Sequence, residues 1–145
     1  MIKVAICDDD IQFIYKLEQS IFRFAEMKRI KVDVDGYTSG AEFIQKLQQS
    51  ERYDLLFLDI ELGDSSGIIV GNWIRSQIQY ESMQIVFVSA KEMYAMQLFD
   101  LRPMNFLVKP IQQERVDYIL DEYERLYQFQ PHIIEIGKGR NSISK

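Results

Sequence analysis

Cysteine is almost absent from this sequence, because Cys7 is the only one among 145 residues. One cysteine excludes a disulfide framework, and the N-terminus does not resemble a secretion signal, so we expect a cytoplasmic protein. Long apolar runs are missing too, and none approaches the ~20 residues that a membrane-spanning helix needs. The length is that of one ordinary domain, which can bury a core without disulfides or a structural metal.

Basic residues are fewer than acidic ones, 17 against 22, and they are unevenly distributed. The net charge is −5, which argues against a chain that alone coats nucleic acid or an anionic membrane. Residues 131–145 carry three basic residues and one acidic residue, a net +2, so residues 1–130 carry −7. The composition therefore changes near Pro131, and we expect a main domain over 1–128 and a distinct segment over 129–145.

The main part of the chain alternates between strand-like and helix-like stretches. Strands are expected at 2–7, 30–37, 54–59, 83–89 and 104–108, where apolar runs have strand length. Helices are expected at 10–27, 39–49, 67–79, 91–98 and 112–128, where apolar residues recur with helical spacing. The first helix is expected to turn these residues mostly to one face: Ile11, Ile14, Tyr15, Ile21, Phe22 and Ala25.

Strict alternation of strands and helices predicts an α/β fold, a doubly wound parallel sheet of five strands with helices on both faces. The runs "LLFL" (55–58) and "IVFV" (85–88) are apolar on both sides of the pleat, as strands buried on both faces must be. The run 30–37 is mixed and is expected at an edge of the sheet. In such sheets, ligands bind beyond the carboxyl ends of the strands.

Charged and polar residues stand at those strand ends. They are Asp8, Asp9 and Asp10 after the first strand, Asp59 at the end of the third, Ser89 at the end of the fourth, and Lys109 with Pro110 after the fifth. Crowded carboxylates raise one another's pKa values, so a bound divalent cation or a proton must resolve the conflict. Oxygen ligands without a His or Cys partner favour Mg²⁺ over Zn²⁺.

A carboxylate beside such a cation can act as a nucleophile. Mg²⁺ held by one or two carboxylates keeps coordination positions free for phosphate oxygens. Asp59 is then a credible phosphoryl acceptor that would form an aspartyl phosphate. Lys109 and the Ser89 hydroxyl would contact the phosphoryl oxygens.

Four stretches together resemble the receiver domain of two-component response regulators. They are "VAICDDD", "LLFLDIELGDSSG", "IVFVSA" and "NFLVKP", and the resemblance covers residues 1–128. It implies a flavodoxin-like, CheY-like (βα)₅ fold and a regulator rather than an enzyme, one that promotes its own phosphoryl transfer and dephosphorylation. It also implies a sensor histidine kinase as the phosphodonor partner.

The resemblance assigns roles at the strand ends. Asp59 is implied as the phosphorylation site and a ligand of Mg²⁺ (or Mn²⁺). Asp9 is implied as a direct ligand, Asp8 as a ligand through water, and Glu61 as a ligand through its backbone carbonyl.

Further implied features lie near the fifth strand. The Lys109–Pro110 bond is implied to be cis, and Phe106 is implied to be the aromatic residue that moves with the Ser89 hydroxyl. Two departures from the family pattern are mild: Gly63 replaces a frequent proline, and Ser66 replaces an aspartate but can still cap the following helix.

Two other functions compete with this interpretation. A haloacid-dehalogenase-type phosphatase would use Asp8 as nucleophile and Asp10 as acid/base, but this leaves Asp59 unexplained. Its acidic metal-binding pair could only be Glu114 and Asp117, which stand at helical positions. A degenerate receiver would serve as a docking module and accept no phosphate. Singly, each of these residues also has an ordinary structural explanation; Asp10, for example, could simply complement a helix N-terminus.

The output of the domain is suggested by two further stretches. "EMYAMQLFDLRPMNFLVKPI" resembles receivers attached to LytTR-type DNA-binding domains. The tail "HIIEIGKGRNSISK" suggests a strand, a Gly-x-Gly turn and the start of a second strand, although a disordered polar tail is the alternative. We therefore expect residues 129–145 to be a linker and the first residues of a truncated effector, through which alone the protein would contact DNA.

Activation is expected to produce a homodimer through the fourth helix, the fifth strand and the fifth helix. No membrane partner is expected. The residues expected to be exposed on this face are Tyr94, Gln97, Arg102, Tyr118 and Glu122.

Glu61 and Lys91 flank the expected phosphoryl site. Each stands two residues beyond a site residue, Asp59 and Ser89 respectively. An ion pair between them could shield the acyl phosphate from water and lengthen its life. An exposed pair is worth only ~0.2–1 kcal/mol, so the expected effect on rate is a few-fold.

Overall fold

The computed structural model describes residues 1–128 and contains the expected parallel sheet. Its strands are β1 (Ile2–Cys7), β2 (Val32–Tyr37), β3 (Leu55–Asp59), β4 (Gln84–Ser89) and β5 (Asn105–Val108). All neighbouring strands are parallel, in the order β2-β1-β3-β4-β5. The predicted fold class is confirmed, and so is the edge position of the second strand. The expected strand and turn in residues 132–145 lie outside the described part.

The chain divides into two compact units, Met1–Ile111 and Gln112–Lys145. The first holds the sheet and the helices α1 (Ile11–Lys28), α2 (Gly40–Gln48) and α3 (Gly67–Arg75), with 3₁₀ helices η1 (Ile78–Tyr80) and η2 (Glu92–Leu101). The second contains α4 (Gln113–Tyr123), which continues as a π-helical turn, η3 (Glu124–Gln128). Within residues 1–128, no helix has the length and apolar character needed to cross a membrane.

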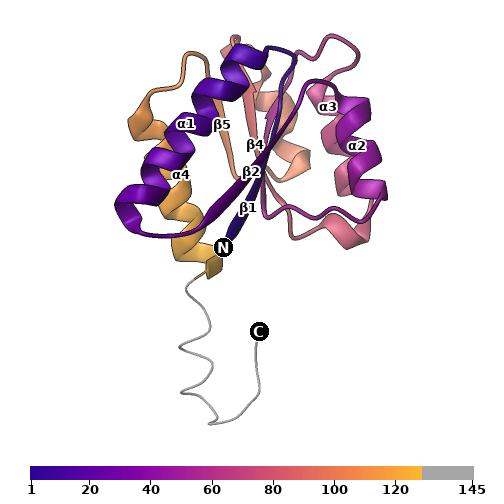
Figure 1. The fold of residues 1–145 in the computed structure, drawn as a ribbon. Coiled ribbons are helices and arrows are strands. Elements are labelled where there is room, and N and C mark those ends of the chain that lie inside the picture. The colour runs from indigo at the N-terminus through magenta and orange to yellow at the C-terminus, as the bar shows by residue number, and fades with distance from the viewer. Residues whose placement is uncertain (129–145) are drawn as a thin grey trace. The chain divides into compact units, whose positions relative to one another are not determined.

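Helices cover both faces of the sheet within the first unit. In Figure 1, α1 lies on one face, while α2 and α3 lie on the other. On the second face, one buried cluster contains residues of the sheet and of both helices: Ala5, Leu56 and Phe87 of the sheet, Phe43 of α2 and Ile74 of α3. Every residue of β3 is buried, which agrees with a central strand that is apolar on both sides. Asp59 therefore ends a strand that is buried along its whole length.

Side chains at the helix starts explain where the helices begin. Asp10 caps α1, since its Oδ1 accepts hydrogen bonds from the backbone N–H groups of Gln12 (3.0 Å) and Phe13 (3.3 Å). Ser66 caps α3 by accepting from the N–H of Ile68 at 3.1 Å, as expected for the residue that replaces the usual aspartate. These caps fix the first turn of each helix beside the carboxyl ends of the strands.

The predicted apolar face of the first helix is partly wrong. Ile14, Ile21 and Ala25 are buried as expected, but Ile11 and Tyr15 are 68% and 63% exposed. Phe22 is also exposed, and the buried face is completed by Leu17 and Phe24 instead. The helix carries two neighbouring apolar stripes, and only one of them can face the sheet.

The expected helix at 91–98 forms, but as the longer 3₁₀ helix η2. Its buried residues, Leu98 and Leu101, are three apart, which matches three residues per turn. The helices expected at 67–79 and 112–128 keep α-helical geometry only to Arg75 and Tyr123.

Candidate functional site

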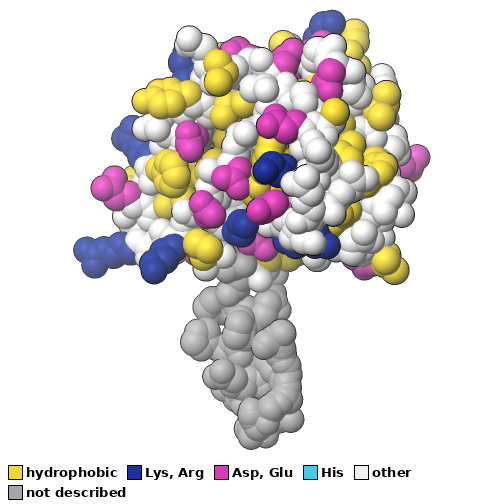
Figure 2. Space-filling view, turned by 45° about the vertical axis from the view of Figure 1, so that its right-hand side comes forward, with side chains coloured by type: hydrophobic (Ala, Val, Ile, Leu, Met, Phe, Trp, Pro, Cys, Tyr) yellow, Lys and Arg dark blue, Asp and Glu magenta, His cyan; other side chains and the backbone are white. Residues whose placement is uncertain are grey.

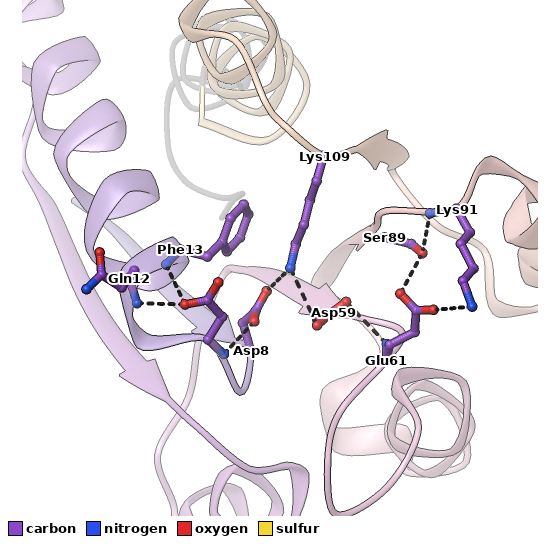
Figure 3. Close-up of polar contacts among 9 residues, drawn as sticks. Asp8, Gln12, Phe13, Asp59, Glu61, Ser89, Lys91 and Lys109 are labelled. Carbon is purple, nitrogen blue, oxygen red and sulfur yellow. Dashed lines mark hydrogen bonds and ion pairs between the residues drawn. The ribbon is translucent and has the colours of Figure 1, made fainter.

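Four strand ends bring the predicted site residues to one rim of the sheet. Asp59 and Ser89 are the last residues of β3 and β4, while Asp8 and Lys109 directly follow β1 and β5. Because β1, β3, β4 and β5 lie in this order in a parallel sheet, their carboxyl ends meet at the same edge. Figure 3 shows the side chains of Asp8, Asp59 and Lys109 converging between these strand ends.

Three carboxylates form a compact cluster at this rim. Asp8, Asp9 and Asp59 each offer a carboxylate oxygen, and these oxygens lie within 4.8 Å of one another. Asp8 and Asp59 are 1% and 4% exposed, whereas Asp9 is exposed. A set of oxygen donors with one solvent-facing member fits a hard divalent cation with free coordination positions.

The fold makes the negative charge of Asp59 costly. Burial, followed by the charge of Asp8, raises the pKa of Asp59 to about 6, although Lys109 opposes the shift. Since this pKa lies above the ordinary value of 3.8, the ionised carboxylate destabilises the fold at pH values above about 6. The cost fades as the pH falls toward the ordinary value. A bound cation would relieve it at neutral pH, so the cluster fits a metal site electrostatically.

Lys109 lies among these carboxylates. Its Nζ is 2.8 Å from Asp8 Oδ2 and 3.6 Å from Asp59 Oδ2. Burial acts to lower the pKa of Lys109, but the hydrogen bond to Asp8 and the charges of Asp59 and Asp8 outweigh it and raise the pKa. The ammonium group is therefore charged and within reach of any group bound to Asp59.

Glu61 contacts residues at or just beyond the ends of β3 and β4. Its carboxylate forms the expected ion pair with Lys91, with Nζ and Oε2 3.1 Å apart. Its second oxygen accepts a hydrogen bond from the Ser89 hydroxyl at 3.3 Å, a contact that the sequence analysis missed. The Glu61 N–H donates to Asp59 Oδ1 at 3.2 Å (Figure 3). One residue thus connects Asp59, Ser89 and Lys91.

The remaining predicted site residues lie near β5. The Lys109–Pro110 peptide bond is cis, as predicted. Phe106, a residue of β5, is half-buried, packs against the core cluster and is in register with Phe87 of β4. Asp10 lies apart from the cluster in function, because its Oδ1 caps α1.

Two glycines leave room around the site. A Cβ at Gly63 would lie 3.1 Å from Asp9 Oδ2, and a Cβ at Gly67 would lie 2.2 Å from the Asp59 carbonyl oxygen. The loop that follows β3 therefore passes close to both acidic residues. Gly67 also donates its N–H to the Ile60 carbonyl at 2.8 Å, which fastens the start of α3 to the end of β3.

This chain is similar in sequence to known proteins. The sequence model of the family described as "Response regulator receiver domain" matches residues 4–121. Sensory transduction protein LytT of Bacillus cereus is 30% identical over 131 residues, which cover 90% of this chain and 50% of the relative. Sensory transduction protein LytR of Streptococcus agalactiae is 30% identical over 126 residues, covering 87% of this chain and 49% of the relative. The chain spans about half the length of these curated relatives.

Solved structures agree on the fold. The response regulatory domain of mrkE from Klebsiella pneumoniae has a TM-score of 0.74 at 24% identity, covering 88% of this chain and 99% of that one. Response regulator TrrA from Thermotoga maritima, solved in complex with Mg(2+)-BeF, has a TM-score of 0.68 at 23% identity, covering 84% of this chain and 98% of that one. With the family match over most of its length, the chain belongs to the response regulator receiver domain family.

Proposed function

We propose that Asp59 accepts a phosphoryl group from a sensor histidine kinase and that this modification switches the domain. The observation that carries the proposal is the convergence of Asp8, Asp9 and Asp59 within 4.8 Å, with the Lys109 ammonium 3.6 Å from Asp59. In the transfer, an Asp59 oxygen bonds to phosphorus while the bond from phosphorus to the kinase histidine nitrogen breaks. The nitrogen keeps the electron pair, so no other reactant is needed.

A divalent cation, Mg²⁺ or Mn²⁺, would be held by Asp9 directly, by Asp8 through water, by Asp59 and by the Glu61 backbone carbonyl. When bound, it supplies positive charge that neutralises phosphoryl oxygens. Lys109 would bind one phosphoryl oxygen and Ser89 another. Response regulator TrrA, a protein of the same fold, was solved in complex with Mg(2+)-BeF, which supports binding of a divalent cation.

Phosphorylation by a small-molecule donor tests the proposal. With acetyl phosphate and Mg²⁺, the 145-residue chain should gain one phosphoryl group, detected by mass spectrometry and by retardation in a phosphate-binding gel. A chelator should block the gain, because the three carboxylates would then repel the donor. A chain that takes up no phosphoryl group under these conditions would instead be a docking module.

The phosphatase alternative has little support in the geometry. Asp10, its acid/base, caps α1 by accepting hydrogen bonds from the N–H groups of Gln12 and Phe13. The receiver family match leaves no need for it.

We propose that phosphorylation of Asp59 shifts the domain from one conformation to another. Ser89 would turn toward the phosphoryl group and Phe106 would move into the vacated space. We propose that η2 and β5 then pair with a second copy, and that the fifth predicted helix, α4, takes part as expected from the sequence. Gln97, Arg102 and Tyr118 are exposed, as expected. Tyr94 and Glu122 are half-buried, so their predicted exposure is wrong. Tyr94 packs against the core cluster, and Glu122 accepts a hydrogen bond from Tyr118.

We further propose that residues 1–128 form the receiver domain and that residues 129–145 lead into a LytTR-type DNA-binding domain. The chain spans about half the length of the LytT relative, which leaves room for a second domain in a protein of that length. Dimerisation would bring two such domains onto paired DNA half-sites. We propose a cytoplasmic location, because a receiver that controls DNA binding acts there.

The Glu61–Lys91 ion pair is proposed to lengthen the life of the phosphoryl group. Glu61→Ala and Lys91→Ala should each speed dephosphorylation, up to about five-fold, because an exposed pair is worth ~0.2–1 kcal/mol. The rate is measured by following loss of the phosphorylated band after removal of acetyl phosphate. Glu51→Ala is the matched control, since it removes a surface ion pair with Lys3 (3.3 Å). Equal rates in all three variants and the unaltered chain would contradict the role.

A further inference from the structure

An aromatic ring covers the Lys109 ammonium from the side of α1. The Lys109 Nζ lies 4.3 Å from the centroid of the Phe13 ring. Phe13 belongs to the first turn of α1, and its backbone N–H is tied to the capping Asp10 side chain at 3.3 Å. Figure 3 shows the ring beside the end of the lysine side chain. Nothing in the spacing of the sequence relates Phe13 to Lys109.

Lys109 is long and flexible, so its position needs an explanation. Its side chain has four rotatable bonds, and 22% of it is exposed. The carboxylates of Asp8 and Asp59 attract the ammonium but act through two oxygens at unequal distances, 2.8 and 3.6 Å. The face of an aromatic ring attracts a cation as well, so the Phe13 ring adds a third attraction to those of the two carboxylates.

We propose that Phe13 is a positioning residue, whose ring face holds the Lys109 ammonium beside Asp59 so that it meets an incoming phosphoryl group without rearrangement. This inference rests on the proposed function, in which Lys109 binds a phosphoryl oxygen. The rigid first turn of α1 fixes the ring, and the ring fixes the amine. A lysine already in place loses less conformational freedom when the phosphoryl group arrives.

Replacing the ring by an apolar side chain of similar bulk isolates its electrostatic part. Phe13→Leu should slow phosphorylation by acetyl phosphate about two- to five-fold, the range of a partly exposed cation–π contact. Phe13→Tyr keeps the ring face and should retain the rate of the unaltered chain. The small donor matters because no kinase surface then touches α1.

A second readout requires no phosphoryl transfer. In chain labelled with ¹³C-lysine, the ring current of Phe13 should shift the Lys109 ε-methylene proton signals upfield; Lys109→Met identifies those signals. The shift should vanish in Phe13→Leu and persist in Phe13→Tyr. Tyr15→Leu is the matched control, because Tyr15 is another aromatic residue of α1 but is 63% exposed.

The outcomes separate the inference from the proposed function. Equal Lys109 shifts in Phe13→Leu and the unaltered chain, or equal phosphorylation rates in Phe13→Leu and Phe13→Tyr, would overturn the positioning role. A Tyr15→Leu variant that slows as much as Phe13→Leu would overturn it too. An unaltered chain that shows the shift but never accepts phosphate would instead remove the proposed function.

Discussion

Replacing Asp59 by asparagine is expected to abolish phosphoryl uptake completely. The amide keeps the shape of the carboxylate, but its oxygen is a far weaker nucleophile and it carries no charge for a cation. Asp59 is 4% exposed and is the one acidic residue that the buried strand β3 brings to the site. The measurement is phosphoryl incorporation from acetyl phosphate with Mg²⁺, read by intact mass.

Asp8→Asn provides the control for this experiment. Asp8 lies in the same cluster and contacts Lys109 at 2.8 Å, so its loss should slow incorporation without preventing it. Labelling that survives in Asp59→Asn but disappears in Asp8→Asn would reverse the assignment and favour the phosphatase. Thermal unfolding of both variants checks that they are folded.

Gly67→Ala is expected to destabilise the domain strongly. The new Cβ would lie 2.2 Å from the Asp59 carbonyl oxygen and 2.8 Å from the Ile60 Cα. Both are backbone atoms, so the start of α3 must move away from β3 and weaken the Gly67–Ile60 hydrogen bond. We expect a loss of about 3 kcal/mol in the free energy of unfolding, or about 10 °C in Tm, measured by circular dichroism with a chelator present.

Gly63→Ala is the matched control in the same loop. There a Cβ would meet only the end of the Asp9 side chain, at 3.1 Å, and that side chain is exposed and can turn away. Its Tm should remain close to that of the unaltered chain. If Gly67→Ala were as stable as Gly63→Ala, the close approach of α3 to β3 would be refuted.

Much of the fold could be predicted from the order of the apolar runs in the sequence. The strand containing "LLFL" had to be central because both of its faces are apolar, and the mixed run at 30–37 had to be an edge. Helix orientation was harder, since α1 carries Ile11 and Tyr15 on one stripe and Ile14 and Ile21 on another. Helical periodicity locates apolar stripes but does not say which one the sheet will cover.

The candidate site, like the fold, could be predicted from the sequence only in part. Asp59, Asp8 and Lys109 could be predicted to meet, because parallel strands present their carboxyl ends together. The contacts of Phe13 with Lys109 and of Glu61 with Ser89 depend on side-chain conformations and on how α1 is rotated. No sequence spacing records those variables, so these partners emerge only from the three-dimensional structure.

The two edges of the sheet differ in a way that bears on self-association. Edge strand β2 carries Asp33 and Asp35, whereas β5, "NFLV" at the opposite edge, carries no charged residue. Strand-to-strand pairing of two molecules through β2 would bring like charges together, and proteins commonly protect exposed edges with such charges. Acidic side chains at β2 therefore disfavour aggregation there, and they leave the β5 side as the edge that a neighbouring molecule can approach without repulsion.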